Sequence, residues 1–518
     1  MILNTVDSLL VRWQVVFTNR PGEKCILLFT ALARGMFLAL LLVSSVRGSD
    51  RPNFLFILTD DQAPHTLAVY GNQTCQTPNI DRIAREGILI RDAHHMGSWA
   101  GAVCLPSRTM IMTGRSVWQI PGSSRIASRE LRKEQAMEAA KTSMPALFNS
   151  AGYDTFRTCK KSNTFKPANA LFKVNHEGEK RGGNAEDGSA WHAERALEFL
   201  REHASRGEDK PFLMYLGFSH PHDPRNGTPE LLKKYGAVNA VEPVKTLNPA
   251  APPLPVSYLP AHPFPHGHPG LRDEVKVSGV LTDRSEATIR NELGREYACI
   301  ENIDRQIGRV LEELETMGVL ENTYVVFTSD HGIAVGRHGL VGKQNLYEHT
   351  WRVPLLVRGP RIESGSEASG YVYLMDLLPT LCDLAGIEIP NSIDGISFRP
   401  VLEGKKDHIR DVMYGVYCGG TKPGIRSVKK DGWKLIKYDV LEGKVRETQL
   451  FDLRKNPDEL LVEHQAPEVI ALTGNTPLEN QVDLAEDPAY ASKRQELEAL
   501  LLNEQSRLHD PYRLWDQP

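Results

Sequence analysis

The sequence has few cysteines for its length, and none of them are paired. Seven occur in 518 residues, at widely separated positions, and no C-x-x-C spacing is present. Zinc sites and small disulfide scaffolds need such clusters, so this scarcity argues against both as the basis of the fold. One or two disulfide bridges remain compatible with the sequence. The odd total leaves one cysteine available for a separate task.

Neither sign of charge predominates. The 61 lysines and arginines nearly balance the 65 aspartates and glutamates, the formal net charge is −4, and no long run of like charge occurs. A dedicated nucleic-acid binder needs a basic surface, so we expect no nucleic acid as a partner, although a local basic pocket is compatible with this balance. No internal repeat is visible. The length suffices for one large domain and a smaller one.

The N-terminal segment has the pattern of an export signal. Arg12, Arg20 and Lys24 precede an apolar stretch that ends in small residues. The continuous apolar part, residues 36–46, is too short to span a bilayer comfortably. We therefore interpret residues 1–49 as a signal peptide, with an uncleaved membrane anchor as the alternative. The protein is then exported to the periplasm or the extracellular space, or to the lysosome or secretory route in a eukaryote.

Four apolar runs, each followed by polar residues, organise the rest of the chain. They are "NFLFILTDDQ", "YDTFRTCKK", "PFLMYLGFSHPHDP" and "TYVVFTSDHG", and helical patterns such as residues 192–204 and 297–318 lie between them. The first run is apolar without alternation, which is typical of a strand buried on both faces of a parallel sheet. Strands that alternate with helices predict an α/β fold, a large and mostly parallel sheet flanked by helices.

Polar side chains gather where these runs end. In open α/β sheets, ligands bind beyond the carboxyl ends of the strands. The residues placed there are Asp60, Asp61, Lys160, His222, Asp330 and His331. One such group is usually a solvated loop, but four groups at one sheet edge predict a binding site.

The chain divides by composition into a catalytic domain, residues 50–409, and a smaller α+β subdomain, residues 410–518. A proline- and histidine-rich insertion, residues 225–282, is expected to form a long surface loop. Its histidines could line a cleft or bind a metal, although a solvated loop is the favoured interpretation. In the subdomain, the sequence predicts hairpin-type strands within 424–440 and 445–459 and a helix over 489–508.

The stretch "AVCLPSRTMIMTGR", residues 102–115, places a cysteine at the mouth of a short helix. Pro106 suits the first helical turn and Gly114 suits the C-terminal cap. Arg108 follows Cys104 by four residues and so projects from nearly the same helix face. Helix N-termini and arginine side chains both attract anions. The pattern therefore predicts a reactive sulfur, or a group derived from it, next to an oxyanion.

This stretch resembles the signature of the type I sulfatases of the alkaline-phosphatase superfamily, C-x-P-S-R followed by T-G-R. The segments "NFLFILTDDQ", "PHDP", "FTSDHG" and "GLVGKQNLYEHTWRVPLLVRGP" resemble further family motifs in the same order. The resemblance covers essentially the whole mature chain. It implies the alkaline-phosphatase-like fold, sulfatase activity and a formylglycine-generating enzyme as a maturation partner. That enzyme would oxidise Cys104 to formylglycine, an aldehyde that hydrates to a geminal diol.

The resemblance also implies a metal site and catalytic roles. Asp60, Asp61, Asp330, His331 and the diol at position 104 would hold Ca²⁺, or Mg²⁺ or another divalent cation. His331 stands where many members have asparagine, so a nitrogen ligand leaves the metal identity open. The further catalytic residues would be Arg108, Lys160, His222 and Lys343.

In the implied mechanism, one diol hydroxyl attacks sulfur with the help of Asp330, and the alcohol leaves with a proton from Lys343 or His222. The second hydroxyl then expels sulfate. Many members have a histidine where this chain has Ser162, and that histidine is assigned to the last step. His220 or a histidine of the insertion would have to replace it.

Export and the histidine-rich insertion favour a sulfated saccharide as the substrate. Two alternatives remain. A phosphodiester or phosphonate monoester hydrolase would use the same fold and the same modified cysteine. A non-catalytic, carbohydrate-binding protein would keep Cys104 as an unmodified thiol.

Overall fold

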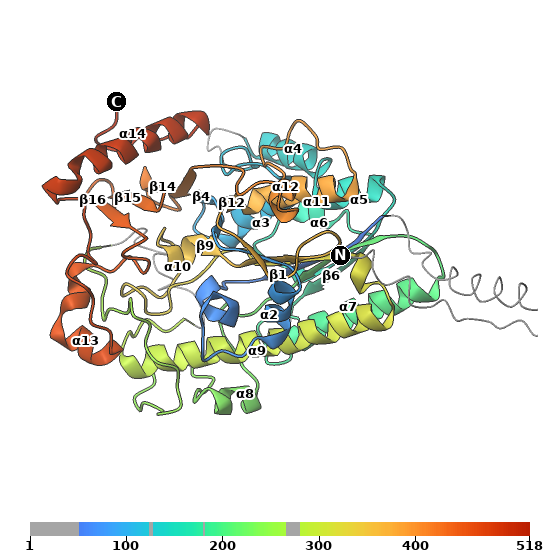
Figure 1. Cartoon of the computed structure of the whole chain (residues 1–518), viewed down its shortest axis with the longest axis horizontal. Coiled ribbons are helices and arrows are strands. Elements are labelled where there is room, and N and C mark those ends of the chain that lie inside the picture. Colours follow the sequence, from blue (N-terminus) through green and yellow to red (C-terminus); the bar gives the residue numbers. More distant parts are fainter. Residues whose placement is uncertain (1–50, 124–127, 180–181, 266–279) are drawn as a thin grey trace, which may run out of the picture. The chain divides into compact units, whose positions relative to one another are not determined.

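An eight-stranded, mostly parallel sheet runs through the middle of the structure (Figure 1). The computed structural model describes residues 51–518 apart from 124–127, 180–181 and 266–279, so the predicted signal over 1–49 lies outside the described residues. In spatial order the strands are β11 (Ser366–Ala368), β2 (Ile88–Ile90), β10 (Leu355–Arg358), β8 (Thr323–Ser329), β1 (Asn53–Thr59), β7 (Phe212–Gly217), β5 (Asp154–Lys160) and β6 (Val174–Gly178). Strand β10 runs antiparallel to both of its neighbours. The predicted α/β fold is confirmed.

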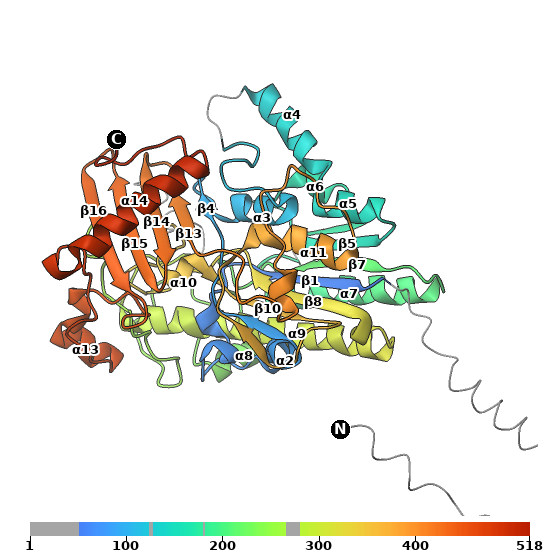
Figure 2. The same ribbon diagram turned by 45° about the horizontal axis from the view of Figure 1, so that its top comes forward.

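Helices cover both faces of this sheet (Figures 1 and 2). Phe54, Phe56 and Leu58 of β1 point to one face, and Leu55 and Ile57 point to the other. The first face is covered by α3 (Cys104–Thr113), α4 (Arg129–Ala140), α5 (Met144–Ser150), α6 (Lys166–Asn169), α11 (Leu377–Ala385) and α12 (Arg399–Leu402). The second face is covered by α2 (Pro78–Arg85), α7 (Gly188–Ser205), α8 (Pro229–Lys234) and α9 (Glu286–Thr316). Because both faces of β1 are covered by helices, its sequence is apolar at every position from Phe54 to Leu58.

The two predicted helices are present and longer than expected. Residues 192–204 lie inside α7, and residues 297–316 form the C-terminal part of α9, which ends two residues before the predicted end. Helix α9 begins earlier, at Glu286, because Leu293 and Ile289 continue the apolar stripe one and two turns further upstream. Short 3₁₀ helices complete the list: η1 (Pro64–Thr66), η2 (Ala68–Tyr70), η4 (Leu320–Asn322), η5 (Leu374–Asp376), η6 (Val462–Gln465) and η7 (Pro488–Tyr490).

The C-terminal region forms a second sheet that takes one strand from far upstream. Its order is β16 (Val445–Asp452), β15 (Trp433–Val440), β14 (Gly424–Lys430), β13 (Met413–Tyr417) and β4 (Gly97–Ser98). Two helices accompany it, α13 (Pro467–Thr473) and α14 (Ala491–Arg507). The expected strands and terminal helix are confirmed, whereas β4 was not predicted. The boundary at residue 409 stays a prediction.

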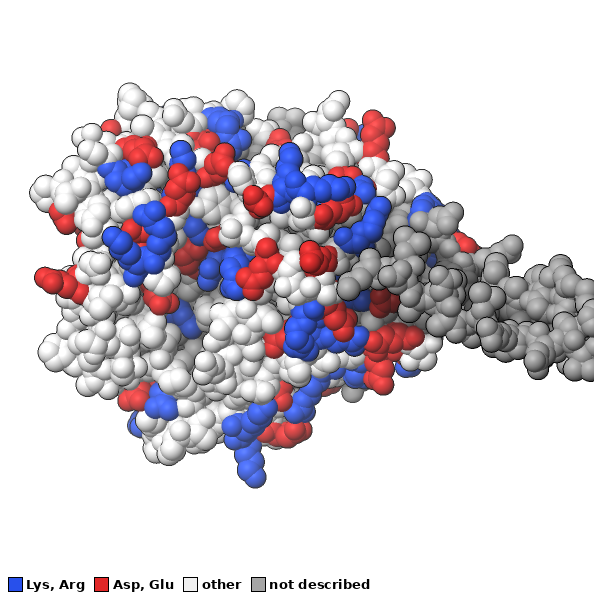
Figure 3. Space-filling view, viewed as in Figure 1, with Lys and Arg blue, Asp and Glu red and all other residues white. Residues whose placement is uncertain are grey.

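A small three-stranded sheet lies between these regions, with the order β12 (Val372–Tyr373), β3 (Ala93–His94) and β9 (Arg352–Val353). Helix α10 (Glu348–Trp351) leads directly into β9. Positive and negative side chains are interspersed over the face shown in Figure 3, in keeping with the near-neutral net charge.

The insertion over residues 225–282 is mostly irregular, as predicted, but it is not simply solvated. It contains α8, and it buries Leu254, Tyr258 and Leu259. Nδ1 of His262 lies 2.9 Å from the carbonyl oxygen of His338. His266 and His268 lie outside the described residues. The described part of the insertion thus packs onto the domain through apolar contacts.

Six cysteines fall in the described part of the chain, and all six are buried free thiols. The bridges left open by the sequence are therefore absent among these six residues, while Cys25 lies outside the described segment. Within the same described ranges, no helix combines the length and the apolar character that crossing a membrane requires.

A buried network of charges ties the C-terminal sheet to α10. The Nζ atom of Lys434 lies 3.0 Å from Glu348 and 2.7 Å from Glu459, and Lys429 lies 3.1 Å from Glu348. All four side chains are almost fully buried. Buried charges need such partners because each would otherwise lose its hydration without compensation.

This network predicts a pH dependence of stability. Burial raises the pKa of Glu459 from 4.5 to about 7. The folded state therefore keeps a proton that the unfolded state releases, so this residue's contribution is complete below pH 4.5 and disappears as the pH rises towards 7. In the wild type, the ionisation of Glu459 should lower the free energy of unfolding by about 3 kcal/mol between pH 4.5 and pH 7. We expect this decrease to be absent in Glu459→Gln. Urea unfolding across this pH range measures it.

The exposed Glu463→Gln variant is the matched control, since it removes a carboxylate a few residues away without touching the network. A Glu459→Gln protein whose unfolding free energy falls with pH as steeply as that of the wild type would contradict this prediction.

Candidate active site

The four strand ends singled out in the sequence are neighbours in the sheet. Strands β8, β1, β7 and β5 lie side by side in this order. Thr59 pairs with Ser329 in register, so the residues that follow each of them, Asp60 and Asp330, leave the sheet together. Lys160 ends β5 and His222 follows β7. The structure thus brings the predicted residues to one edge.

Five side chains converge there on a single point. The carboxylates of Asp60, Asp61 and Asp330, an imidazole nitrogen of His331 and the sulfur of Cys104 all lie within 4.8 Å of one another, and all five residues are buried. Three carboxylates around one point repel each other unless a cation lies among them, and oxygen-rich sets of this kind suit hard divalent cations. The residues therefore fit the predicted metal site.

The orientation of His331 supports this fit. Its Nδ1 atom lies 3.0 Å from the carbonyl oxygen of Gly332, which assigns the ring proton to Nδ1. The Nε2 atom then faces the cluster, 3.2 Å from Asp61 and 3.5 Å from Asp330. An imidazole held by its second nitrogen in this way is oriented as a metal ligand.

The turn after β1 allows two adjacent aspartates to serve the same cluster. Asp61 has φ of 68°, in the left-handed region that aspartate tolerates better than most residues. Its N–H donates to Oδ1 of Asp330 at 3.2 Å. Backbone conformations of this kind persist mainly where a functional site requires them.

Cys104 occupies the predicted place at the first turn of α3. Gly114 caps the helix with φ of 64°, and its N–H donates to the carbonyl oxygen of Met110 at 2.8 Å, as the sequence predicts. Ser107 fixes the helix start to the sheet edge through a 2.6 Å hydrogen bond from Oγ to the carbonyl oxygen of Asp330. The Cys104 sulfur lies 3.1 Å from Nε2 of His331 and 3.6 Å from Oδ1 of Asp60.

An unmodified thiol in this position is a poor nucleophile. Burial raises the pKa of the Cys104 thiol well above its usual value, although Lys160 and Lys343 oppose the shift. The side chain is only 1% exposed. Reactive cysteines depend on a lowered pKa, so without a bound cation this thiol would be a weak nucleophile.

Arg108 joins two of the carboxylates and a second cysteine. Its Nε atom donates to Asp330 at 2.8 Å, Nη2 lies 3.3 Å from Asp60, and Nη1 donates to the sulfur of Cys159 at 2.7 Å. Cys159 was not singled out in the sequence, where its only signal is its position beside Lys160. The guanidinium is thus fixed from three sides.

Two lysines complete the positive charge of the site. Lys160 forms an ion pair with Asp60, and Nζ of Lys343 lies 2.8 Å from Asp61 and 3.7 Å from the Cys104 sulfur. Burial alone would raise the pKa of Asp60, but Lys160 and Arg108 hold it well below the usual range. With a dication added, these groups would leave the site electropositive and able to accept an anion.

His222 lies at the margin of the cluster. Its Nε2 atom is 3.9 Å from Asp61, and Nδ1 is 2.9 Å from the carbonyl oxygen of Asp223. Asp223, also missed in the sequence although it is part of the PHDP motif, lies with Asp61 and His222 in a second group of acidic and imidazole side chains. The side chain of His222 is 19% exposed, which places it at the solvent side of the cluster.

Neither Ser162, which stands in place of the expected histidine, nor His220, one of its predicted replacements, belongs to the five-residue cluster. Ser162 is exposed and does not belong to the cluster. His220 is buried, and its carbonyl oxygen accepts the N–H of Asp60 at 3.2 Å. Its role as a replacement base stays a prediction.

Comparisons with known proteins agree with this geometry. The sequence profile of the family described as "Sulfatase" matches residues 52–387, and that described as "N-sulphoglucosamine sulphohydrolase, C-terminal" matches residues 336–483. An N-acetylglucosamine-6-O-sulfatase of Bacteroides thetaiotaomicron is 26% identical over 488 residues, 79% of this chain and 82% of that protein. An arylsulfatase of Clostridium perfringens is 26% identical over 467 residues, 79% of this chain and 89% of its own.

Solved structures share the fold. One, determined in complex with its substrate D-glucosamine-2-N,6-O-disulfate, has a TM-score of 0.65 at 23% identity and covers 89% of this chain and 99% of its own. The phosphonate monoester hydrolase of Agrobacterium radiobacter has a TM-score of 0.63 at 19% identity, with coverages of 88% and 96%. At these identities the likeness concerns the fold alone.

Proposed function

The chain belongs to the sulfatase family of sulfate-ester hydrolases, and from this premise we propose that it removes sulfate from a sulfated carbohydrate by means of a formylglycine made from Cys104. The observation that carries the proposal is the buried Cys104 sulfur at the start of α3, among Asp60, His331 and Lys343. An amino-sugar sulfate is the favoured substrate, since one relative is named for N-acetylglucosamine 6-O-sulfate and one similar structure holds a glucosamine disulfate.

Two groups that this chain must acquire would supply the central chemistry. The hydrated formylglycine would supply a hydroxyl nucleophile. A divalent cation, Ca²⁺ or Mg²⁺, would polarise that hydroxyl and the sulfate. Asp60, Asp61, Asp330, His331 and residue 104 would hold the cation. In this proposal Asp330 also accepts the hydroxyl proton.

The cationic residues orient the substrate. Arg108 pairs with Asp60 and Asp330, and Lys160 pairs with Asp60, so both are held beside the cluster, where they can bind sulfate oxygens as charge develops on them. Lys343, 3.7 Å from the Cys104 sulfur, and His222, at the solvent side, can each deliver a proton to the leaving alcohol. The proposal includes a formylglycine-generating enzyme as the maturation partner and export of the mature chain.

The test is a comparison of substrates. We expect the protein, coexpressed with a formylglycine-generating enzyme, to hydrolyse para-nitrophenyl sulfate much faster than bis(para-nitrophenyl) phosphate or a para-nitrophenyl phosphonate monoester. Faster turnover of the phosphorus esters would favour the alternative that the Agrobacterium radiobacter structure represents, because the same site accepts tetrahedral oxyanions of both elements.

A panel of sulfated amino sugars then tests the substrate class. Release of sulfate from glucosamine 6-sulfate is the expected result, and release only from non-carbohydrate esters would contradict it. If Cys104 stays an unmodified thiol in a protein that binds but does not cleave these sugars, the chain is a non-catalytic binding protein.

A further inference from the structure

A second cavity lies at the same edge of the sheet, outside the cluster around Cys104. Its volume is about 390 Å³, and it is walled by the segment that follows β1, by α10 and by residues 253–257 of the insertion. The size is that of a small-ligand site. Four of its side chains are basic or imidazole groups, His65, Arg337, His349 and Arg352.

Arg337 is the central feature of this cavity. Its side chain is 8% exposed, and within the described residues its guanidinium donates only to the carbonyl oxygen of Ala334 and forms no ion pair. Glu296 is the acid that acts on it most strongly, yet the two do not reach ion-pair distance and neither carboxylate oxygen of Glu296 has a hydrogen-bond partner in the structure. Nearby carboxylates act on this guanidinium through their charge but form no ion pair with it among the described residues, so its remaining N–H donors can bind an anion.

Two histidines add unused hydrogen-bonding atoms. The Nε2 atoms of His65 and His349 are buried and have no hydrogen-bond partner among the described residues. His349 is only 7% exposed. Both residues line the cavity, and burial lowers the pKa of both rings, which favours neutral imidazoles that can each donate one N–H.

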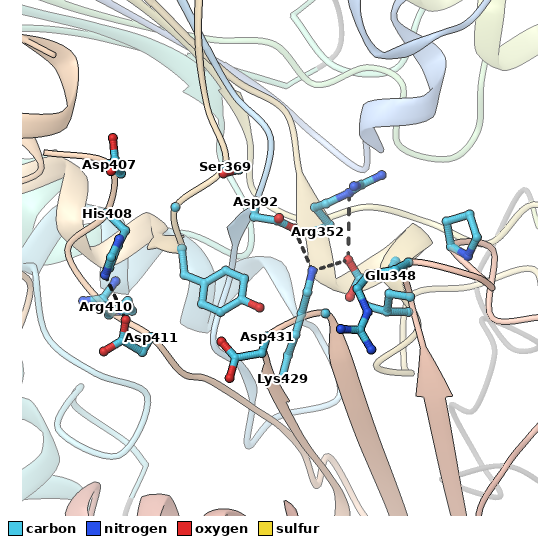
Figure 4. A pocket seen from close by; sticks show the side chains of 16 residues that line it. Asp92, Glu348, Arg352, Ser369, Asp407, His408, Arg410, Asp411, Lys429 and Asp431 are labelled. Carbon is cyan, nitrogen blue, oxygen red and sulfur yellow. Dashed lines mark hydrogen bonds and ion pairs between the residues drawn. The ribbon is translucent and has the colours of Figure 1, made fainter. Parts of the chain in front are cut away.

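The adjoining cavity shows the contrast. It has a volume of about 440 Å³ and shares Glu348 and Arg352 with the first, but its charged side chains pair with each other (Figure 4). Lys429 lies 2.6 Å from Asp92 and 3.1 Å from Glu348, and His408 lies 2.9 Å from Asp411. Lys429 and His408 of this cavity therefore already have carboxylate partners, unlike Arg337 in the described part of the chain.

The acids of the first cavity do not neutralise Arg337 in the same way. Glu348 and Glu459 are directed to Lys434, at 3.0 and 2.7 Å. Asp458 acts on Arg337 through its charge, but it forms no ion pair in the part of the chain that the structure describes. Arg352 reaches Glu348 only at 4.0 Å. The guanidinium of Arg337 thus remains available to a ligand.

The cavity and the catalytic cluster are connected through short segments. His65 follows Asp61 on the same loop, and Arg337 follows His331. The N–H of Gly332, next to His331, donates to the carbonyl oxygen of Thr350, next to His349, at 3.0 Å. The segment that carries His349 of the cavity is therefore in direct backbone contact with the segment that carries His331 of the cluster.

We propose that this cavity binds an oxyanion, a sulfate or carboxylate group, that the saccharide substrate carries outside the ester bond to be cleaved. The inference rests on the proposed function and extends it, since it assigns a polyanionic saccharide as the substrate. Arg337 supplies the guanidinium fork that matches two oxyanion oxygens, and His65 and His349 supply single N–H donors.

The test compares Arg337→Gln with Arg129→Gln, which removes the same charge from an exposed position on α4. The substrates are para-nitrophenyl sulfate, which has a single anionic group, and a tetrasaccharide that carries several sulfate and carboxylate groups. We expect Arg337→Gln to raise KM for the tetrasaccharide about tenfold more than KM for para-nitrophenyl sulfate, with little change in kcat. Arg129→Gln should change neither value, and Arg337→Lys should recover part of the loss.

Each other result decides against the proposal or against one part of it. Equal changes in both KM values, or no change, would overturn it. Inorganic sulfate could raise the thermal unfolding temperature of the wild type but not of Arg337→Gln, while both KM values stay unchanged. In that case the cavity holds the free anion and the saccharide assignment is wrong. Should Arg337→Gln fail to fold by circular dichroism, His349→Gln takes its place. If the wild type cleaves neither substrate, the proposed function fails, and calorimetric titration of the tetrasaccharide into wild type and variant still decides the binding proposal.

Discussion

Replacing Cys104 with alanine is expected to lower kcat on an aryl sulfate by on the order of 10⁴-fold or more while the protein stays folded. The sulfur of this residue is the atom on which His331, Asp60 and Lys343 converge, at 3.1, 3.6 and 3.7 Å. Alanine cannot become formylglycine, so the surrounding residues would have no nucleophile to orient. Steady-state kinetics measure the loss, and thermal unfolding shows whether the fold is kept.

Cys382→Ala is the matched control, because Cys382 is a buried free thiol on α11 and not part of the cluster. It should keep the wild-type rate. Mass spectrometry of the peptide that contains residue 104 gives the second readout, the exchange of sulfur for a carbonyl oxygen in active protein. A fully active enzyme with an unmodified thiol, or an active Cys104→Ala variant, would contradict the proposal.

The second large effect is expected from Asp330→Asn. The change keeps the size of the side chain but removes the negative charge of the carboxylate. That carboxylate accepts the Nε–H of Arg108 at 2.8 Å and lies 3.5 Å from Nε2 of His331. Cation affinity should fall on the order of 10²-fold and kcat on the order of 10³-fold, because in our proposal the same carboxylate binds the cation and orients the arginine. The bound cation is measured by elemental analysis of the purified protein.

Asp394→Asn is the control, since Asp394 accepts hydrogen bonds from Ser116 and does not belong to the cluster. Chelation of the wild type with EDTA should reproduce the loss in kcat, and added Ca²⁺ should restore it. A variant at position 330 that keeps both its cation and its rate would show that the cluster is not the metal site.

Much of the catalytic edge could be predicted because its residues follow the elements with the clearest patterns. A strand buried on both faces, such as β1, has an uninterrupted apolar sequence, and the two aspartates after β1 show where the strand ends. Pro106 and Gly114 mark α3 in the same way. Where a local pattern sets an element's end, the sequence also locates the side chains next to it.

The parts that were missed depend on contacts between distant segments. Strand β4 has only two residues and no pattern of its own, and it exists because β13 lies beside it. The contact between Cys159 and Arg108 arises from the packing of β5 against α3. The cavity around Arg337 combines six separate segments, and no periodicity in any one of them indicates the others.

The pairing of β4 with β13 also bears on when the proposed oxidation of Cys104 can take place. Gly97 and Ser98 stand shortly before Cys104, whereas their partners Val416 and Tyr417 belong to the last part of the chain to be translated. Until the ribosome has released those partners, the segment that precedes the cysteine has no sheet to join. In the finished domain, Cys104 is closed off from solvent. We therefore expect the oxidising enzyme to act on the growing polypeptide, in the interval between the synthesis of these two segments.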